Sequence, residues 1–149
     1  VIKAPRMYFL DTGLCAHMMG WGNAKVLENS AMSGAFFETW AVSEIYKSYL
    51  NVGKRPPLYF YRDSTKKEID LIIYQNGIVY PIEIKKGSSP KDAVKNFSVL
   101  APIEAEPEKD AFSGSAHLKT EIGTGAVVCL SSDILPIDKK NWYVPAWLI

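Results

Sequence analysis

Two apolar runs flank an Asn-Gly pair in residues 68–85, which read EIDLIIYQNGIVYPIEIK. Asn-Gly between apolar runs is the strongest short signal for a β-hairpin, because both residues tolerate the positive φ of a type I′ turn. A two-residue loop at Asn76-Gly77 places Gln75 opposite Ile78. The stretch therefore predicts strands over 68–74 and 78–84, and it fixes their register.

This register places Asp70 directly opposite Glu83, with Cβ atoms roughly 4.5–5.5 Å apart. Lys85 follows Glu83 by two residues, so we expect it on the same face, together with Ile72 and Pro81. Two partly covered carboxylates that face each other repel unless something positive lies between them. The other face is predicted to be wholly apolar and to consist of Ile69, Leu71, Ile73, Ile82 and Ile84.

Periodicity and end signals predict the remaining elements. These are a strand at 7–10, a helix beginning at Asp11-Thr12, an irregular segment at 21–30, a helix at about 34–50 capped by Ser33 and ended by 51–53, a strand at 58–61, a helix at 90–100, a loop at 101–124, a buried strand at 126–130 and a strand-like tail at 142–149. The order of helix, three strands, helix and strand predicts a mixed α/β domain. We expect an antiparallel meander, followed by a helical crossover that brings the last strand in parallel.

Composition bounds the class of protein. With 149 residues, 48% hydrophobic and 22% charged, the chain matches one ordinary globular domain, or one domain with a fragment of a neighbour. The net charge of +1 does not mark a nucleic-acid or membrane partner, although 54–95 carries an excess of Lys and Arg. No apolar run approaches the roughly 20 residues of a membrane span. Without a signal-peptide pattern or a disulfide framework, we expect a cytoplasmic protein and no membrane partner.

The chain begins with Val1 rather than Met, so we expect a piece of a longer protein. We divide it into an N-terminal strand and helix segment, 1–30, and an α/β domain, 31–149. One interpretation of the first segment is the end of a preceding winged-helix region.

A divalent cation removes the conflict between facing carboxylates. Mg²⁺ takes oxygen ligands, usually one or two carboxylates completed by waters and substrate phosphate. A lysine beside such a site orients or activates a water and stabilises negative charge on phosphate. The hairpin thus carries the groups needed to hydrolyse a phosphodiester with Mg²⁺ or Mn²⁺. In the alternative interpretation, Glu83 and Lys85 form only a same-face ion pair on a solvated sheet.

These residues also carry a resemblance. Asp70 and Glu83-Ile84-Lys85, preceded by a helix with Gly34 and Glu38, resemble the PD-(D/E)XK nuclease core in its Holliday-junction-resolvase-like form. More closely, the chain resembles the C-terminal domain of unknown function that follows the ATPase module in a family of prokaryotic AAA+ ATPases. The matching stretches are 5–14, 34–38, 61–63, 68–70 and 81–85.

The resemblance implies a restriction-endonuclease-like fold that acts on DNA. It implies that Glu38, Asp70 and Glu83 bind Mg²⁺ and that Lys85 assists the attacking water. Ile69 stands where the motif's namesake has proline. The resemblance also implies an upstream ATPase module. No G-x-x-x-x-G-K-[ST] occurs in these residues, so we expect them not to bind ATP by that device themselves. A homodimer is a further expectation, because nucleases that cut both strands often pair.

Several assignments stay open. Glu38 is alternatively a polar residue on an amphipathic helix, and Glu68 is expected to pair with Lys85 across the hairpin or to set its charge state. The acidic stretch around Glu104 is expected to be a solvated face. A second hypothesis is a non-catalytic nuclease-fold module for binding and assembly, suggested by the near-neutral charge and the apolar segments 7–10 and 142–149. Predicted phosphate contacts, with solubility as the alternative, are Arg62, Lys66, Lys67 and Lys86.

Overall fold

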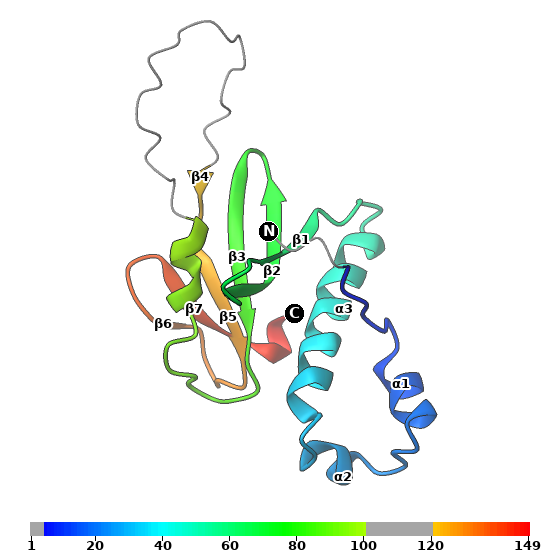
Figure 1. Cartoon of the computed structure of the whole chain (residues 1–149). Helices are drawn as coiled ribbons and strands as arrows, with labels where there is room; N and C mark the ends of the chain where they lie inside the picture. Colours follow the sequence, from blue (N-terminus) through cyan, green and yellow to red (C-terminus); the bar gives the residue numbers. More distant parts are fainter. Residues whose placement is uncertain (1–4, 101–120) are drawn as a thin grey trace, which may run out of the picture.

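One mixed sheet forms the centre of the computed structural model, which describes residues 5–100 and 121–149. Within these residues seven strands follow the order β1-β2-β3-β5-β7-β6, with β4 beside β3 (Figure 1). The bounds are β1 Leu58–Arg62, β2 Glu68–Gln75, β3 Ile78–Ile84, β4 Glu121–Ile122, β5 Gly125–Cys129, β6 Leu135–Pro136 and β7 Asn141–Pro145. The mixed α/β class is thus confirmed, while the acidic stretch around Glu104 lies outside the described residues.

The β2–β3 hairpin has the predicted turn and register. Asn76 and Gly77 have φ angles of 55° and 80°, as a type I′ turn requires. The antiparallel ladder runs from Gln75 paired with Ile78 to Leu71 paired with Ile82. On the far side of β3, β5 and then β7 pair in parallel, which confirms the predicted parallel strand.

Helix α3, Ser33–Asn51, covers one face of the sheet. Its buried residues Ala41, Val42 and Ile45 form one core cluster with residues of β2, β3 and β5. The helix ends as predicted, where Gly53 adopts a φ of 69° and donates its N–H to the Leu50 carbonyl. The predicted cap was wrong by one residue: Ser33 is the first helical residue, and Met32 at the N-cap makes no side-chain hydrogen bond.

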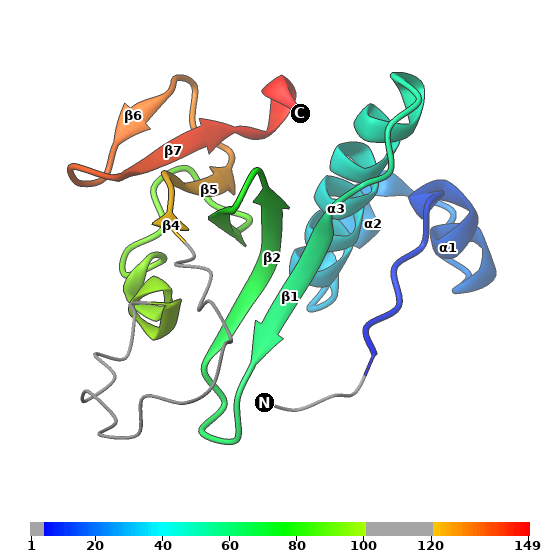
Figure 2. The ribbon, with the colours of Figure 1, turned by 90° about the horizontal axis from the view of Figure 1, so that it is seen from above.

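The opposite face is covered by η1, a 3₁₀ helix spanning Lys95–Leu100 (Figure 2). Phe97 packs there against Ile69 and Ile72. We predicted a helix over 90–100; a helix forms only over its second half, as a 3₁₀ helix, and the predicted start at Pro90 was wrong. The reason is local, because Asp92 has a φ of 56°, which no residue inside a right-handed helix adopts.

The N-terminal elements differ in part from expectation. Helix α1, Thr12–Met18, begins as predicted, with the Asp11 carboxylate accepting the Leu14 N–H. The short helix α2, Ala24–Glu28, lies in the segment predicted to be irregular, and Asn23 caps it. The predicted strand at 7–10 does not form.

The C-terminal tail was predicted as a broken strand. Its last part is instead a 3₁₀ helix, η2, Ala146–Leu148, because Pro145 ends β7 without an N–H to donate. The two-residue strands β4 and β6 carry too little pattern to be predicted. Among the described helices, none combines the length and apolarity needed to cross a membrane.

Candidate functional site

A β-bulge on β2 sets the position of Asp70. Beside β1, Tyr59 pairs with Ile72 and Tyr61 pairs with Ile69, so β2 has one more residue than β1 over this interval. Such a bulge re-aims side chains. Ile69 therefore packs with Phe97 on the η1 side, and the prediction that it shares an apolar face with Leu71 and Ile82 was wrong.

The bulge also separates β2 from β3. The Asp70 Oδ2 atom accepts the backbone N–H of Ile84 at 3.0 Å. In a continued ladder this N–H would donate to the carbonyl of Ile69. The carboxylate therefore replaces a strand carbonyl, which accounts for a charged side chain that is only 6% exposed.

The sequence predicted that Asp70 and Ile72 lie on the same face of the sheet, and this prediction was wrong. Asp70 borders a cavity of about 250 Å³ together with Leu71 and, from α3, Val42 and Tyr46. Glu83 pairs with Val127 of β5, whose side chain packs on the side away from α3. The two carboxylates nevertheless lie close together beyond the end of the β2–β3 ladder, where the charge of Asp70 acts on Glu83.

Lys85 joins the two carboxylates. Its Nζ atom lies 2.6 Å from Glu83 Oε1 and 3.3 Å from Asp70 Oδ2. The structure thus brings together the three hairpin residues to which the sequence assigned a catalytic role. The side chain of Lys85 is 45% exposed, so the otherwise buried pair has an opening to solvent.

Burial shapes the charge states of this group. The pKa of Glu83 is raised, first by burial and then by the charge of Asp70, and Lys85 offsets only part of this shift. Burial acts to lower the pKa of Lys85, but the hydrogen bond to Glu83 and the charges of both carboxylates outweigh it and raise the pKa. Lys85 is therefore a cation at neutral pH.

One oxygen of this group has no partner. Glu83 Oε2 is buried and makes no hydrogen bond within the described residues. A buried acceptor without a donor is costly, by roughly 1–3 kcal/mol or more for a charged group. This atom is consequently a place where a cation or a water would be stabilising.

Glu38 points from α3 toward a second cation, Arg6. The Glu38 Oε1 atom accepts hydrogen bonds from the Tyr8 hydroxyl at 3.0 Å and from Arg6 Nη1 at 3.1 Å. Burial and the charge of Glu38 raise the pKa of Tyr8 to about 12, so Tyr8 remains a donor over the whole physiological range. Arg6 Nη1 also lies 4.0 Å from Asp70 Oδ1.

Arg6 and Tyr8 were not among the predicted site residues. Their only signal in the sequence is their membership of the stretch 5–14, which carries the resemblance to the ATPase family. Nothing in residues 5–10 predicts that this segment crosses to α3 and β2, because the contacts are long-range.

Glu68 does not form the ion pair that the sequence predicted. We expected it to pair with Lys85, yet its ion pairs within the described residues are with Arg6 and with Arg62, the latter at 3.7 Å. The bulge accounts for this difference, because it ends the hairpin register before Glu68 is reached.

The carboxylates were predicted to hold Mg²⁺ as a set of three. In the described part of the chain, no group of three or more Asp, Glu, His or Cys side chains is placed to hold a metal ion. Arg6 separates Glu38 from Asp70. Asp70 and Glu83 remain as a two-carboxylate donor set, and the free Glu83 Oε2 fits a hard cation that completes its shell with water and phosphate.

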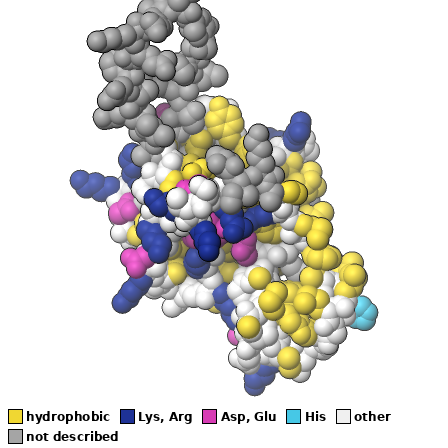
Figure 3. All heavy atoms as spheres, in the orientation of Figure 1, with side chains coloured by type: hydrophobic (Ala, Val, Ile, Leu, Met, Phe, Trp, Pro, Cys, Tyr) yellow, Lys and Arg dark blue, Asp and Glu magenta, His cyan; other side chains and the backbone are white. Residues whose placement is uncertain are grey.

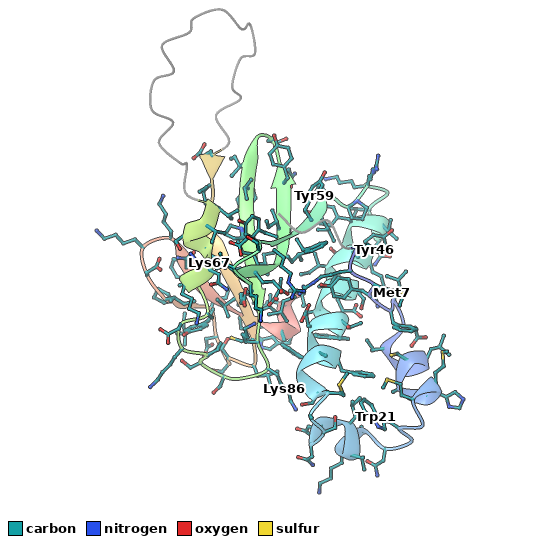
Figure 4. The ribbon with its side chains drawn as sticks, viewed as in Figure 1. Met7, Trp21, Tyr46, Tyr59, Lys67 and Lys86 are labelled. Atoms are coloured by element: carbon teal, nitrogen blue, oxygen red, sulfur yellow. The ribbon has the colours of Figure 1, made fainter. Side chains whose placement is uncertain are left out.

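The predicted phosphate-binding residues fall into two places. Arg62 ends β1, and Lys66 and Lys67 lie in the turn that leads into β2, where Asp63 accepts the Lys67 N–H. Lys86 lies apart from Lys67 in Figure 4 and donates to the Glu28 carbonyl at 2.6 Å. Figure 3 shows Lys and Arg side chains interspersed with Asp and Glu over the middle of one face, and hydrophobic side chains gathered toward the α1–α2 side.

Comparison with known proteins gives distant relatives. The chain is similar to uncharacterized proteins of Mycobacterium bovis and Mycobacterium tuberculosis, each 28% identical over 102 residues. The alignment covers 68% of this chain and 22% of each relative, so the chain spans about a fifth of the length of the curated relatives it matches. No solved structure matches it. The model of a family described as a domain of unknown function, DUF4143, matches residues 33–149, and the chain therefore belongs to this family.

Proposed function

We propose that this chain is a PD-(D/E)XK nuclease-like domain with a restriction-endonuclease-like fold, which hydrolyses phosphodiester bonds of DNA with Mg²⁺ or Mn²⁺. The observation that carries the proposal is the bridge that Lys85 makes between Asp70 and Glu83, beside the unpartnered Glu83 Oε2. Metal-dependent hydrolysis of a phosphodiester needs carboxylates that hold the metal and a nearby cation, at a site that solvent and substrate can reach.

Each residue of the site has a separate role in this proposal. Asp70 and Glu83 would hold the metal, which when bound polarises the phosphate and makes its bound water more acidic. Without a metal, Lys85 is a cation, because the hydrogen bond to Glu83 and the charges of both carboxylates raise its pKa. It would stabilise negative charge on the phosphate and orient the attacking water. Glu38 is the third predicted ligand, and it would need to leave Arg6 in order to reach a metal.

DNA and protein partners are part of the proposal. Arg62, Lys66 and Lys67 precede Asp70 by a few residues and would contact the phosphate backbone. The relatives are several times longer than the aligned region, which leaves room for the upstream ATPase module that we propose. Such a domain would act on DNA in the cytoplasm, with a homodimer as the form that cuts both strands.

Cleavage assays test this function. The protein is incubated with plasmid and with branched DNA, in Mg²⁺ and in Mn²⁺. Asp70→Asn is the informative variant, because an amide oxygen still accepts the Ile84 N–H while the charge is lost. We expect cleavage by the wild type and by the control Glu44→Gln, which removes a carboxylate from the exposed face of α3. Absence of cleavage by the wild type, or full activity of Asp70→Asn, would reject the catalytic proposal.

A non-catalytic binding and assembly module is the second candidate. One observation favours it: Arg6 already neutralises Glu38 and Glu68 without any metal. Exposed apolar side chains such as Met7 and Trp147, 85% and 70% exposed, would then contact the neighbouring ATPase. A pull-down with the full-length ATPase supports this candidate if binding occurs without Mn²⁺ uptake at Asp70 and Glu83. A strictly monomeric domain that captures no ATPase counts against it.

A further inference from the structure

The segment Pro5–Leu10, here called the strap, lies across the site without being part of the sheet. It contains no helix or strand, and within the described residues no backbone hydrogen bond joins it to another segment. It leads into α1 along α3 (Figures 1 and 2). Its polar attachments are made by the side chains of Arg6 and Tyr8.

Ion pairs with carboxylates are the main contacts of Arg6, which also donates a hydrogen bond to the Tyr8 hydroxyl. Its guanidinium pairs with Glu38 and Glu68 and lies 4.0 Å from Asp70. Its central carbon also lies 5.3 Å from the centre of the Phe60 ring, within the range of a cation–π contact. The side chain is 24% exposed, so these attractions are only partly screened by water.

The charges of the whole site are nearly balanced before any metal enters. We define the carboxylate cluster as Glu38, Glu68, Asp70 and Glu83; the cations paired with it are Arg6, Arg62 and Lys85. Among the described residues, four negative charges face three positive ones, so a divalent cation would turn this net −1 into a net +1. Like charges at this range repel, and the cation expected to leave is one that directly pairs with the cluster from a segment whose backbone no hydrogen bond anchors.

Arg6 is that cation. Lys85 follows β3 directly, and its backbone N–H donates to the Val128 carbonyl, whereas Arg6 belongs to a strap without such bonds. Arg62 touches the cluster only through Glu68 at 3.7 Å. Departure of Arg6 would also free Glu38, the predicted third ligand, to turn toward Asp70.

We propose that the strap is a displaceable cover of the carboxylate cluster, in which the Arg6 guanidinium and a divalent cation bind in competition. This inference rests on the proposed function in one respect, namely that Asp70 and Glu83 bind a divalent cation. It adds that the metal-free protein is closed by its own N-terminal segment, and that metal binding opens it.

Calorimetric titration of the full chain with Mn²⁺ provides the first test. Arg6→Gln removes the competing charge, so we expect it to bind Mn²⁺ on the order of tenfold more tightly than the wild type. Arg55→Gln is the matched control, because Arg55 is exposed and pairs with no described carboxylate, and its affinity should equal that of the wild type. Arg6→Lys retains the charge and should bind Mn²⁺ less tightly than Arg6→Gln.

Tryptic cleavage after Arg6 provides a second readout that does not depend on activity. In the metal-free protein Arg6 is engaged with the cluster, so cleavage there should be slow. We expect Mn²⁺ to accelerate it, while cleavage after the exposed Lys139 in the β6–β7 turn proceeds at an unchanged rate.

The outcomes separate the two proposals. Suppose that the wild type and Arg6→Gln bind Mn²⁺ with equal affinity and that Asp70→Asn abolishes this binding. This result overturns the proposal that the strap competes with the metal, and it leaves the proposed function standing. Mn²⁺ binding by Arg6→Gln but not by the wild type strongly supports the proposal that the strap competes with the metal. Absence of Mn²⁺ binding by every variant overturns both.

Discussion

The Asp70 carboxylate accepts the backbone N–H of Ile84 at 3.0 Å, so one side chain serves both the charge of the site and the hydrogen bonding of the sheet. Replacement by alanine leaves a buried N–H without an acceptor, whereas asparagine retains one. We expect Asp70→Ala to be less stable than Asp70→Asn by about 1–3 kcal/mol, as measured by urea unfolding. Equal stability of the two variants would show that water replaces the carboxylate.

Glu83 should make stability depend on pH. Its pKa is raised in the folded state by burial and by Asp70, so the folded protein takes up this proton more readily than the unfolded chain does. Ionised Glu83 therefore costs stability at neutral pH, and the cost disappears as the pH falls through the raised pKa and then below the unfolded value.

We accordingly expect Glu83→Gln to have a higher Tm than the wild type at pH 7, with a difference that closes below about pH 4.5, the ordinary value for Glu. Calorimetry across this range checks it. Glu44→Gln, which loses only a half-exposed ion pair with Lys47 one turn away on the same helix, should shift the Tm little at any pH. A lower Tm for Glu83→Gln at pH 7 would mean that the bond to Lys85 outweighs burial.

The hairpin turn depends on backbone conformation at Gly77. Its φ is 80°, and a Cβ at this position would meet nothing within 4 Å, so the only penalty for a side chain is conformational. We expect Gly77→Ala to destabilise the fold by about 1 kcal/mol. The control is Gly87→Ala, where space is equally open and φ is not positive, and where stability should stay the same or rise slightly. Similar losses in both variants would contradict this account.

The basic turn before β2 should determine how DNA binding responds to salt. Each phosphate contact releases counterions, so replacing both Lys66 and Lys67 by Gln should weaken duplex binding and lower the slope of log K against log salt by about 0.9 per lysine. Fluorescence anisotropy over a salt series measures this. Lys139→Gln and Lys140→Gln, in the turn between β6 and β7, should leave the slope unchanged. Equal effects of the two pairs would indicate only a general effect of charge.

The hairpin was the most predictable part of the fold. Asn76 and Gly77 fix a turn locally, and the apolar runs around them fix the register, so both could be derived without tertiary information. The parallel strand β5 was predictable for a similar reason, because its unbroken apolar run is typical of a strand covered on both faces.

The errors arise where one residue changes the local geometry. Alternation was applied through Asp70, but the bulge reverses the phase there and moves Ile69 to the η1 side. A positive φ at Asp92 likewise interrupts a helical pattern that looked continuous. Both positions are Asp, a residue that is depleted in strands and enriched at positive φ, but such a preference is too weak to place a bulge or a helix break at one position.

The candidate site was predictable only along the hairpin. The structure brings Asp70, Glu83 and Lys85 together, and all three come from one supersecondary unit. The contacts of Glu38 with Arg6 and Tyr8 join segments about thirty residues apart, and no local pattern encodes such a meeting. The partner of Glu68 was predicted wrongly because the bulge ends the hairpin register before this residue, and one of its two cations, Arg6, comes from the distant strap.

The additional residue in β2 carries an implication for the regularity of the strand. If β2 continued without the bulge, regular alternation would place residue 70 on the same side of the sheet as Ile72. Position 70 would then point toward Phe97, into apolar surroundings where a carboxylate is strongly disfavoured. An ionised carboxylate at position 70 is therefore compatible with the bulged β2 strand and not with a regular one.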